Sequence, residues 1–222
     1  MSVDVGTLVP ELVLSDPEAG RRWLEAVLGF RHEDGVLRLG NQTLLVAKES
    51  PAERHGWVDH LALAVPDLAA ALTDAQGRGA RLGPATPDGP LSIREFSTQG
   101  VSYAFVEGPE GANIELIAPL DAGARHGPGH DHIGLPCSAL GPMRAFLLDL
   151  GGVETSSHVL RRPTGDVEVC FLRLGSSVAE IYSPRGMRAG FEVRPGSGFW
   201  RLRMAGLDAP RKGPGGVEVL PL

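Results

Sequence analysis

Apolar and polar residues alternate in the same order along two separate segments of the chain, residues 59–68 and 131–140. The segments read DHLALAVPDL and DHIGLPCSAL, so each begins with Asp-His and has a leucine eight positions after its histidine. Alternation with a period of two is typical of a strand that buries one face. The larger apolar residues share one face, and the histidine shares the other with small residues such as Ala62 and Gly134. We therefore predict two copies of one strand, each packed on the core through its larger face.

Helical spacing of apolar residues follows each of these strands and occurs once more near the start of the chain. Trp23 and Val27, for example, are four positions apart, and a glycine stands at or near the end of each helical stretch. The pattern predicts helices over residues 17–29, 68–80 and 140–152. Short strand-like runs come next, at residues 35–40, 43–48, 102–107, 113–118, 167–175 and 178–183.

The recurring unit is a strand, a helix and three further strands (βαβββ), and it occurs three times. We name the copies module A (7–49), module B (57–119) and module C (130–186). Residues 198–222 begin and end like strands, but their Pro and Gly content forbids a helix, and we name them module D, a truncated fourth copy. The sequence thus predicts an α+β protein built from tandem βαβββ modules.

A Gly- and Pro-rich segment separates modules B and C and is the best candidate for a linker. The predicted organisation is a domain of modules A and B in residues 1–120, a linker in 121–129, and a domain of modules C and D in 130–222.

Composition limits the classes of partner. The 222 residues carry a net charge of −6 and no basic stripe, which argues against binding of nucleic acid. No apolar run approaches the roughly 20 residues of a membrane span, and the first residues lack the features of a signal peptide. We therefore expect a cytoplasmic protein that binds a small molecule. Cys137 and Cys170 lie in apolar runs and are expected to be reduced core thiols.

Four residues on the small-residue faces are candidates for chemistry. His60 and His132 begin equivalent strands, and Glu115 and Glu180 lie in the last strands of modules B and C. A buried carboxylate needs a partner, and a divalent metal ion beside neutral imidazoles meets that need. Recurrence alone could be an accident of duplication.

Module A shows that the four residues are not simply a feature of the unit. The positions of His132 and Glu180 correspond there to about Pro10 and to Leu45, neither of which binds metals. His130 and Asp131, next to His132, are expected at the rim of the site.

The chain resembles the vicinal oxygen chelate superfamily, which includes glyoxalase I, methylmalonyl-CoA epimerase, extradiol dioxygenases and bleomycin resistance proteins. The matching motifs are VDHLALAVPDLAAAL, EGPEGANIELIAP, HDHIGLPCSALGPMRAFLLDLGG and FLRLGSSVAEIYSP. The resemblance implies a glyoxalase-like fold, in which two βαβββ units form a curved mixed sheet around one metal ion, and a homodimer.

The resemblance also implies which residues act. His60, Glu115, His132 and Glu180 would bind one divalent ion, either Ni, Co, Zn, Mn or Fe. The ion would leave two positions for adjacent oxygens of a small substrate and would stabilise an enediolate or enolate. Glu115 or Glu180 would be the catalytic base of a lyase, isomerase or epimerase.

Two questions stay open at the level of the sequence. If modules pair in chain order, A with B and C with D, the four candidates lie in different sites, and the second site would add Glu218 and place Arg201 or a neighbour where a dioxygenase has its second histidine. Module D lacks a helix and is a poor partner for C, which favours pairing of B with C and leaves A and D as outer units.

The alternative functions are a metal-free binding protein of the antibiotic-resistance type and an extradiol-dioxygenase-like oxidoreductase.

Overall fold

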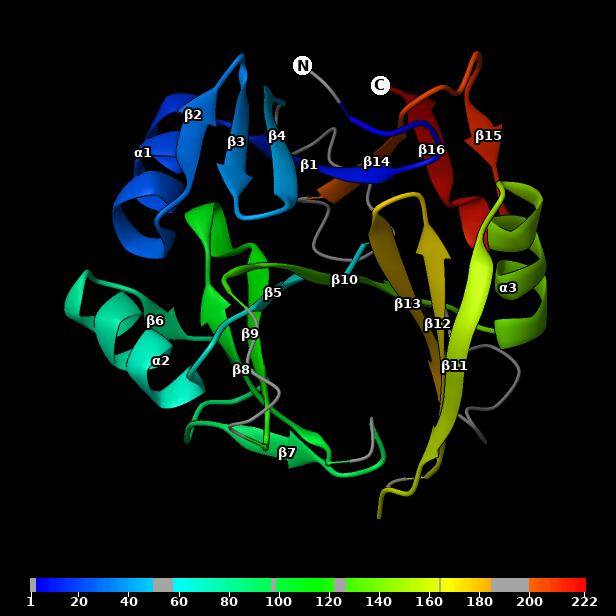
Figure 1. Ribbon diagram of the computed structural model, residues 1–222. Helices are drawn as coiled ribbons and strands as arrows, with labels where there is room; N and C mark the ends of the chain where they lie inside the picture. The colour runs from blue at the N-terminus through cyan, green and yellow to red at the C-terminus, as the bar shows by residue number, and fades with distance from the viewer. Residues whose placement is uncertain (1–2, 50–57, 97–98, 122–126, 164, 185–199) are drawn as a thin grey trace.

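The computed structural model describes residues 3–49, 58–96, 99–121, 127–163, 165–184 and 200–222 (Figure 1). These residues form two mixed sheets with helices on their outer sides. The helices are α1 (Pro17–Leu28), α2 (Leu68–Gly77) and α3 (Leu140–Asp149), and two single turns of 3₁₀ helix are η2 (Pro109–Gly111) and η4 (Pro214–Gly216). The chain therefore has the α+β fold of tandem βαβββ modules that the sequence predicts.

Modules B and C share the larger sheet, whose strand order is β11-β12-β13-β10-β5-β9-β8-β6, with β7 paired to β8. Its strands are β5 (His60–Ala64), β6 (Arg81–Leu82), β7 (Leu91–Ile93), β8 (Val101–Glu107), β9 (Asn113–Pro119), β10 (Gly129–Pro136), β11 (Val153–Leu160), β12 (Val167–Leu174) and β13 (Ser177–Pro184). The first strands β5 and β10 run antiparallel at the centre, and each lies parallel to the last strand of its own module. The sheet curves strongly around its inner face (Figure 1).

Modules A and D share the smaller sheet, in the order β15-β16-β14-β1-β4-β3-β2. Its strands are β1 (Leu8–Leu14), β2 (Arg31–Glu33), β3 (Val36–Leu39), β4 (Gln42–Lys48), β14 (Trp200–Met204), β15 (Arg211–Lys212) and β16 (Glu218–Pro221). The antiparallel pair β1–β14 corresponds to β5–β10 in the larger sheet. Of the two pairings that the sequence leaves open, the structure therefore has B with C, and A and D pair with each other. Each predicted domain contributes strands to both sheets.

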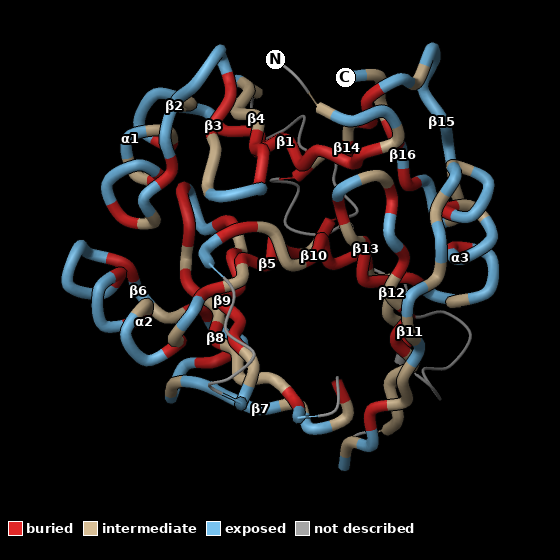
Figure 2. Tube along the Cα trace, viewed as in Figure 1, coloured by how far each residue is buried: buried red, intermediate tan, exposed pale blue. Residues whose placement is uncertain are grey.

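The hydrophobic core lies between the sheets and their helices (Figure 2). Leu61 and Ile133, at the middle of β5 and β10, are fully buried and pack in one cluster with Leu72 of α2 and Met143 of α3. The alternation along these strands thus directs their larger side chains toward the helices. The other face, which carries the histidines, is the inner face of the curved sheet.

A turn shared by modules B and D explains how the truncated module packs. The segments GPEG and GPGG form η2 and η4, and Glu110 and Gly215 have the same left-handed backbone, with φ of 54° and 68°. Module A packs its helix α1 on η2, and module C packs α3 on η4. Each of these turns thus packs on the helix of the preceding module, and module D, which has no helix of its own, contacts α3 through η4.

The sequence did not predict every element. The short strands β2, β6, β7 and β15 and the edge strand β11 were missed, because they lack a run of large apolar residues. Residues 122–126 of the predicted linker lie outside the described residues. None of the helices that the structure describes is long and apolar enough to cross a membrane.

Candidate metal centre

The strand register of the larger sheet places the four candidate residues in two rows that cross three strands each. One row runs His132, Ala62, Glu115 over β10, β5 and β9. The other runs His60, Gly134, Glu180 over β5, β10 and β13. A small residue stands in the middle of each row, so the long side chains on either side can lean toward one another.

The middle residue of the second row must be small. A Cβ atom added to Gly134 would lie 2.1 Å from Cε1 of His60, far inside the contact distance of two carbon atoms. The His60 ring therefore lies directly over Gly134. In the first row Ala62, which is fully buried, has the corresponding place below His132.

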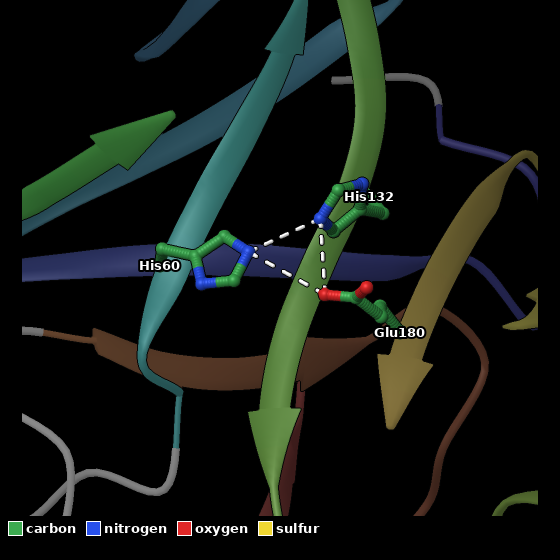
Figure 3. A group of neighbouring side chains, drawn as sticks. All are labelled: His60, His132 and Glu180. Atoms are coloured by element: carbon green, nitrogen blue, oxygen red, sulfur yellow. Dashed lines mark hydrogen bonds and ion pairs between the residues drawn. The ribbon is translucent and has the colours of Figure 1, made fainter. Parts of the chain in front are cut away.

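His60, His132 and Glu180 point toward one another (Figure 3), and Glu115 contacts both histidines at the same place. The Nε2 atoms of His60 and His132 are 3.1 Å apart. Oε2 of Glu115 lies 3.2 Å from Nε2 of His60 and 3.4 Å from Nε2 of His132, and Oε2 of Glu180 lies 3.7 Å and 3.3 Å from the same two atoms. All four residues are buried. His60, His132 and Glu180 offer ligand atoms within 4.8 Å of one another and could hold a metal ion.

The electrostatics of this cluster fit a cation. Burial opposes the charging of His60, but hydrogen bonds to Asp59 and Glu115 outweigh it and raise its pKa to about 9. Burial would lower the pKa of His132, but the negative charge of Glu180 and the hydrogen bond to Asp131 outweigh it and raise this pKa well above its usual value. The buried carboxylates thus require positive charge between them. A divalent ion supplies that charge and leaves the imidazoles neutral, as metal ligands must be.

The structure corrects the prediction that His130 lies at the rim of the site, whereas Asp131 does lie there, with 38% of its side chain exposed. Strict alternation would put His130 on the same face as His132, but the register shifts between them, so that His130 pairs with Leu63 and His132 with Ala62. Asp131 is the extra residue of this bulge and contacts Nδ1 of His132 at 2.7 Å.

His130 is a structural link between modules. Its Nε2 accepts a hydrogen bond from the backbone N–H of Val178 at 2.8 Å, and its Nδ1 therefore donates to Oε1 of Gln42 at 2.6 Å. Burial lowers its pKa to about 4, so the ring is neutral. His130 thus joins module C to module A and takes no part in the cluster.

The corresponding positions of the smaller sheet hold none of the four donors. Its rows are Val9, Arg203, Leu220 and Arg201, Glu11, Leu45. The position of Glu115 is therefore taken by Leu220, and the expectation that Glu218 occupies it is wrong by two residues. The middle positions carry a partly buried ion pair instead, in which Arg203 donates to both carboxylate oxygens of Glu11 at 2.9 Å and 3.1 Å.

Sequence reasoning missed the phenylalanines that contact the cluster. Phe105 on β8 pairs with Glu115, and its ring meets His60 edge-on at a centroid distance of 5.2 Å. Phe171 on β12 pairs with Glu180 and meets His132 in the same way at 5.7 Å. The signal was present, because each phenylalanine precedes the glutamate of its module by nine or ten positions. These rings make the surroundings of the imidazoles apolar.

Comparison with known proteins adds an independent observation. Residues 59–171, just over half of the chain, match the model of a family described as the glyoxalase/bleomycin resistance protein/dioxygenase superfamily. The matched range includes His60, Glu115 and His132. No curated protein sequence matches the chain at a significant level.

Several solved structures are similar to the chain. Glyoxalase I from Zea mays is 13% identical, with a TM-score of 0.61 over 96% of this chain and 91% of its own. A candidate dioxygenase from Bacillus subtilis is also 13% identical, with a TM-score of 0.61 over 98% of this chain and 85% of its own. A methylmalonyl-CoA epimerase from Streptomyces coelicolor is 18% identical over 59% of this chain and 99% of its own, with a TM-score of 0.43. Likeness at such low identity establishes the fold alone.

Proposed function

The chain belongs to the glyoxalase/bleomycin resistance protein/dioxygenase superfamily, and we propose that it is a divalent-metal-dependent lyase, isomerase or epimerase acting on a small oxygenated substrate. One observation carries the proposal. Two imidazoles and two carboxylates, drawn from two modules, converge within hydrogen-bonding distance while buried. Four such groups are costly to bury without a cation between them.

The proposed chemistry is removal of a proton from a carbon atom next to a carbonyl group. A divalent ion held by His60, Glu115, His132 and Glu180 would polarise the carbonyl and so lower the energy of the resulting enolate. The protein supplies the ligands, the apolar surroundings that Phe105 and Phe171 provide, and a carboxylate to accept the proton.

Glu180 is the better candidate for the proton acceptor. Oε2 of Glu115 lies 3.2 Å and 3.4 Å from the Nε2 atoms of the two histidines, so Glu115 is held closely by both. Glu180 lies 3.7 Å from His60 and thus has a close contact only with His132. Glu115 then serves as the fixed metal ligand, and Glu180 as the ligand that leaves the ion and accepts the proton from the substrate.

Metal analysis tests the first part of the proposal. Protein stripped with a chelator is titrated in turn with Ni, Co, Zn, Mn and, without oxygen, Fe(II), and bound metal is measured by mass spectrometry and calorimetry. We expect about one ion per chain in wild-type protein, loss of binding in His132→Ala, and normal binding in the control His32→Ala, which changes an exposed histidine of β2. Absence of a stoichiometric ion with every metal would overturn the proposal and leave a metal-free binding protein.

Proton exchange tests the second part. Metal-loaded protein is incubated in D₂O with methylmalonyl-CoA and with small 2-hydroxy and 2-oxo carbonyl compounds, and loss of the C–H signal is followed by NMR. Glu180→Gln keeps a ligand oxygen but cannot accept the proton, so exchange should fall by about 10²-fold or more while the metal stays bound. If Glu180→Gln exchanges at the wild-type rate, Glu180 is not the base.

A second candidate function is an iron-dependent oxygenase. Two histidines and one carboxylate are the ligand set of many non-haem Fe(II) oxygenases, and His60, His132 and Glu180 provide it within 4.8 Å. In that case Glu115 lies outside the ligand set, and Glu115→Gln should retain Fe(II) at wild-type affinity. Oxygen uptake by the Fe(II) protein with catechol as probe separates the two functions.

A further inference from the structure

Each histidine of the cluster follows an aspartate that contacts its other ring nitrogen. Oδ2 of Asp59 lies 3.0 Å from Nδ1 of His60, and Oδ1 of Asp131 lies 2.7 Å from Nδ1 of His132. A carboxylate can only accept at this distance, so each Nδ1 carries a hydrogen and each Nε2 faces the centre of the cluster. Fixing of the tautomer and of the ring by a carboxylate is a common way of supporting a metal-bound histidine.

Neighbours in a strand point to opposite faces, so an aspartate cannot normally reach the ring of the next residue from within a regular strand. The two modules solve this differently. Asp59 lies just before β5, where its N–H donates to the carbonyl of Gly134 at 2.9 Å. Asp131 is the extra residue of the bulge in β10. Two different backbone arrangements thus produce the same contact between an aspartate and a histidine, which indicates that the contact has a function in the cluster.

The two contacts differ in what supports them. Tyr182 lies two residues after Glu180 on β13, and its hydroxyl interacts with the carboxylate of Asp59. Its ring also lies nearly parallel to that of His60, at a centroid distance of 6.4 Å and an interplanar angle of 27°. The matching position in module B, two residues after Glu115, is Ile117, which has no side-chain group to donate. Module C therefore buttresses the histidine of module B, without a reciprocal contact.

We propose that Asp59 and Asp131 are positioning residues of the metal centre and that Tyr182 acts through Asp59, so that His60 is the more rigidly held of the two histidine ligands. The proposal rests on the metal-binding function proposed above. It assigns the tyrosine to one ligand alone, and this selectivity makes it testable.

The test is a pair of double-mutant cycles read out as metal affinity. Affinity for Co(II) is measured by competition with a chelating dye on protein with the single changes Asp59→Ala, Asp131→Ala and Tyr182→Phe and with the two double changes that include Tyr182→Phe. Each aspartate change should weaken binding by about 10- to 100-fold. Tyr182→Phe should weaken it less, should add nothing to Asp59→Ala, and should keep its full effect together with Asp131→Ala.

Controls separate positioning from folding. Tyr103→Phe removes a half-buried phenol hydroxyl from β8, which does not adjoin the strands of Tyr182 and His60, and should leave the affinity unchanged. The visible spectrum of bound Co(II) should shift in Asp59→Ala and Tyr182→Phe, which a merely less stable protein would not show, and Asp59→Asn should recover part of the affinity.

The outcomes distinguish failure of the positioning roles from failure of the proposed metal-binding function. Equal effects of Tyr182→Phe in both aspartate backgrounds would overturn the selectivity, and wild-type affinity in both aspartate variants would overturn the positioning role, in each case with metal binding intact. If wild-type protein takes up no ion, the proposed function fails and this inference fails with it.

Discussion

Replacement of Gly134 by alanine is the sharpest single test of the geometry of the cluster. The new Cβ would lie 2.1 Å from Cε1 and 2.5 Å from both nitrogens of His60, whereas ordinary contacts begin at 3.4 Å. The ring must therefore move by more than 1 Å, which breaks its contact with Asp59 and turns Nε2 away from Glu115. We expect at least a tenfold loss of metal affinity, because loss of the hydrogen bond that supports a metal-binding histidine typically costs 10- to 100-fold by itself.

The cost to stability should be smaller than the cost to binding. Overpacking of a core typically destabilises by about 1–3 kcal/mol, and for a chain of this length each kcal/mol lowers Tm by roughly 2–4 °C. Calorimetric titration with Ni(II) and thermal unfolding of metal-free protein measure the two effects separately. The matched control is Gly141→Ala in α3, where an added Cβ meets nothing within 4 Å and both quantities should stay near wild type. Wild-type metal affinity in Gly134→Ala would refute the assignment of His60 as a ligand.

Two further predictions concern charge. The pKa of His60 in the folded protein is raised to about 9, so its contribution to the stability of metal-free protein is full below about pH 6.5 and is lost as the pH rises through 9. The pKa of Glu115 is lowered to about 2, so its contribution is full above about pH 4.5 and is lost as the pH falls through 2. The Tm of metal-free protein should therefore be highest between about pH 4.5 and 6.5, and a Tm that does not fall between pH 6.5 and 9 would contradict the assigned contacts. In the smaller sheet, Arg203→Met leaves Glu11 buried without its bidentate partner and should destabilise by about 2–3 kcal/mol, at the low end for a buried pair because the arginine is partly exposed. Metal affinity should not change. Denaturant unfolding of Arg203→Met is compared with that of the double variant Arg203→Met, Glu11→Gln, which should recover stability if the unpaired charge of Glu11 causes the loss.

The sequence was sufficient to predict the modules and the faces of their first strands, because these depend on local alternation. His60 and His132 share a face with Ala62 and Gly134 in the structure as alternation requires, and the larger residues Leu61 and Ile133 are in the core. What alternation cannot reveal is a bulge. The extra residue Asp131 turns His130 away from the cluster and gives Asp131 itself a role beside His132, and no periodic pattern marks the place.

Other features required pairing between distant parts of the chain. Module D has no helix of its own and packs on α3, and β14 pairs with β1 across nearly the whole length of the sequence. The misassignment of Glu218, in contrast, could have been avoided. The shared Gly-Pro turn aligns Pro109 with Pro214 and so aligns Glu115 with Leu220, whereas similarity of the apolar run alone shifts the alignment by two residues.

The two sheets together indicate why only one of them can form a metal centre. Long side chains at the two ends of a row can meet over its middle position only where the middle residue is small, because neighbouring strands lie only about 4.8 Å apart. In the larger sheet the middles are Ala62 and Gly134, and the ends carry the four donors.

In the smaller sheet the middles are Glu11 and Arg203, and their ion pair fills the space in which donors would have to meet. Its ends are accordingly apolar, except for Arg201, which also pairs with carboxylates. The nature of the middle residue thus decides the chemistry of the row. Restoring histidine and glutamate at the ends of the smaller sheet would not by itself create a metal site, since Glu11 and Arg203 would still occupy the centre.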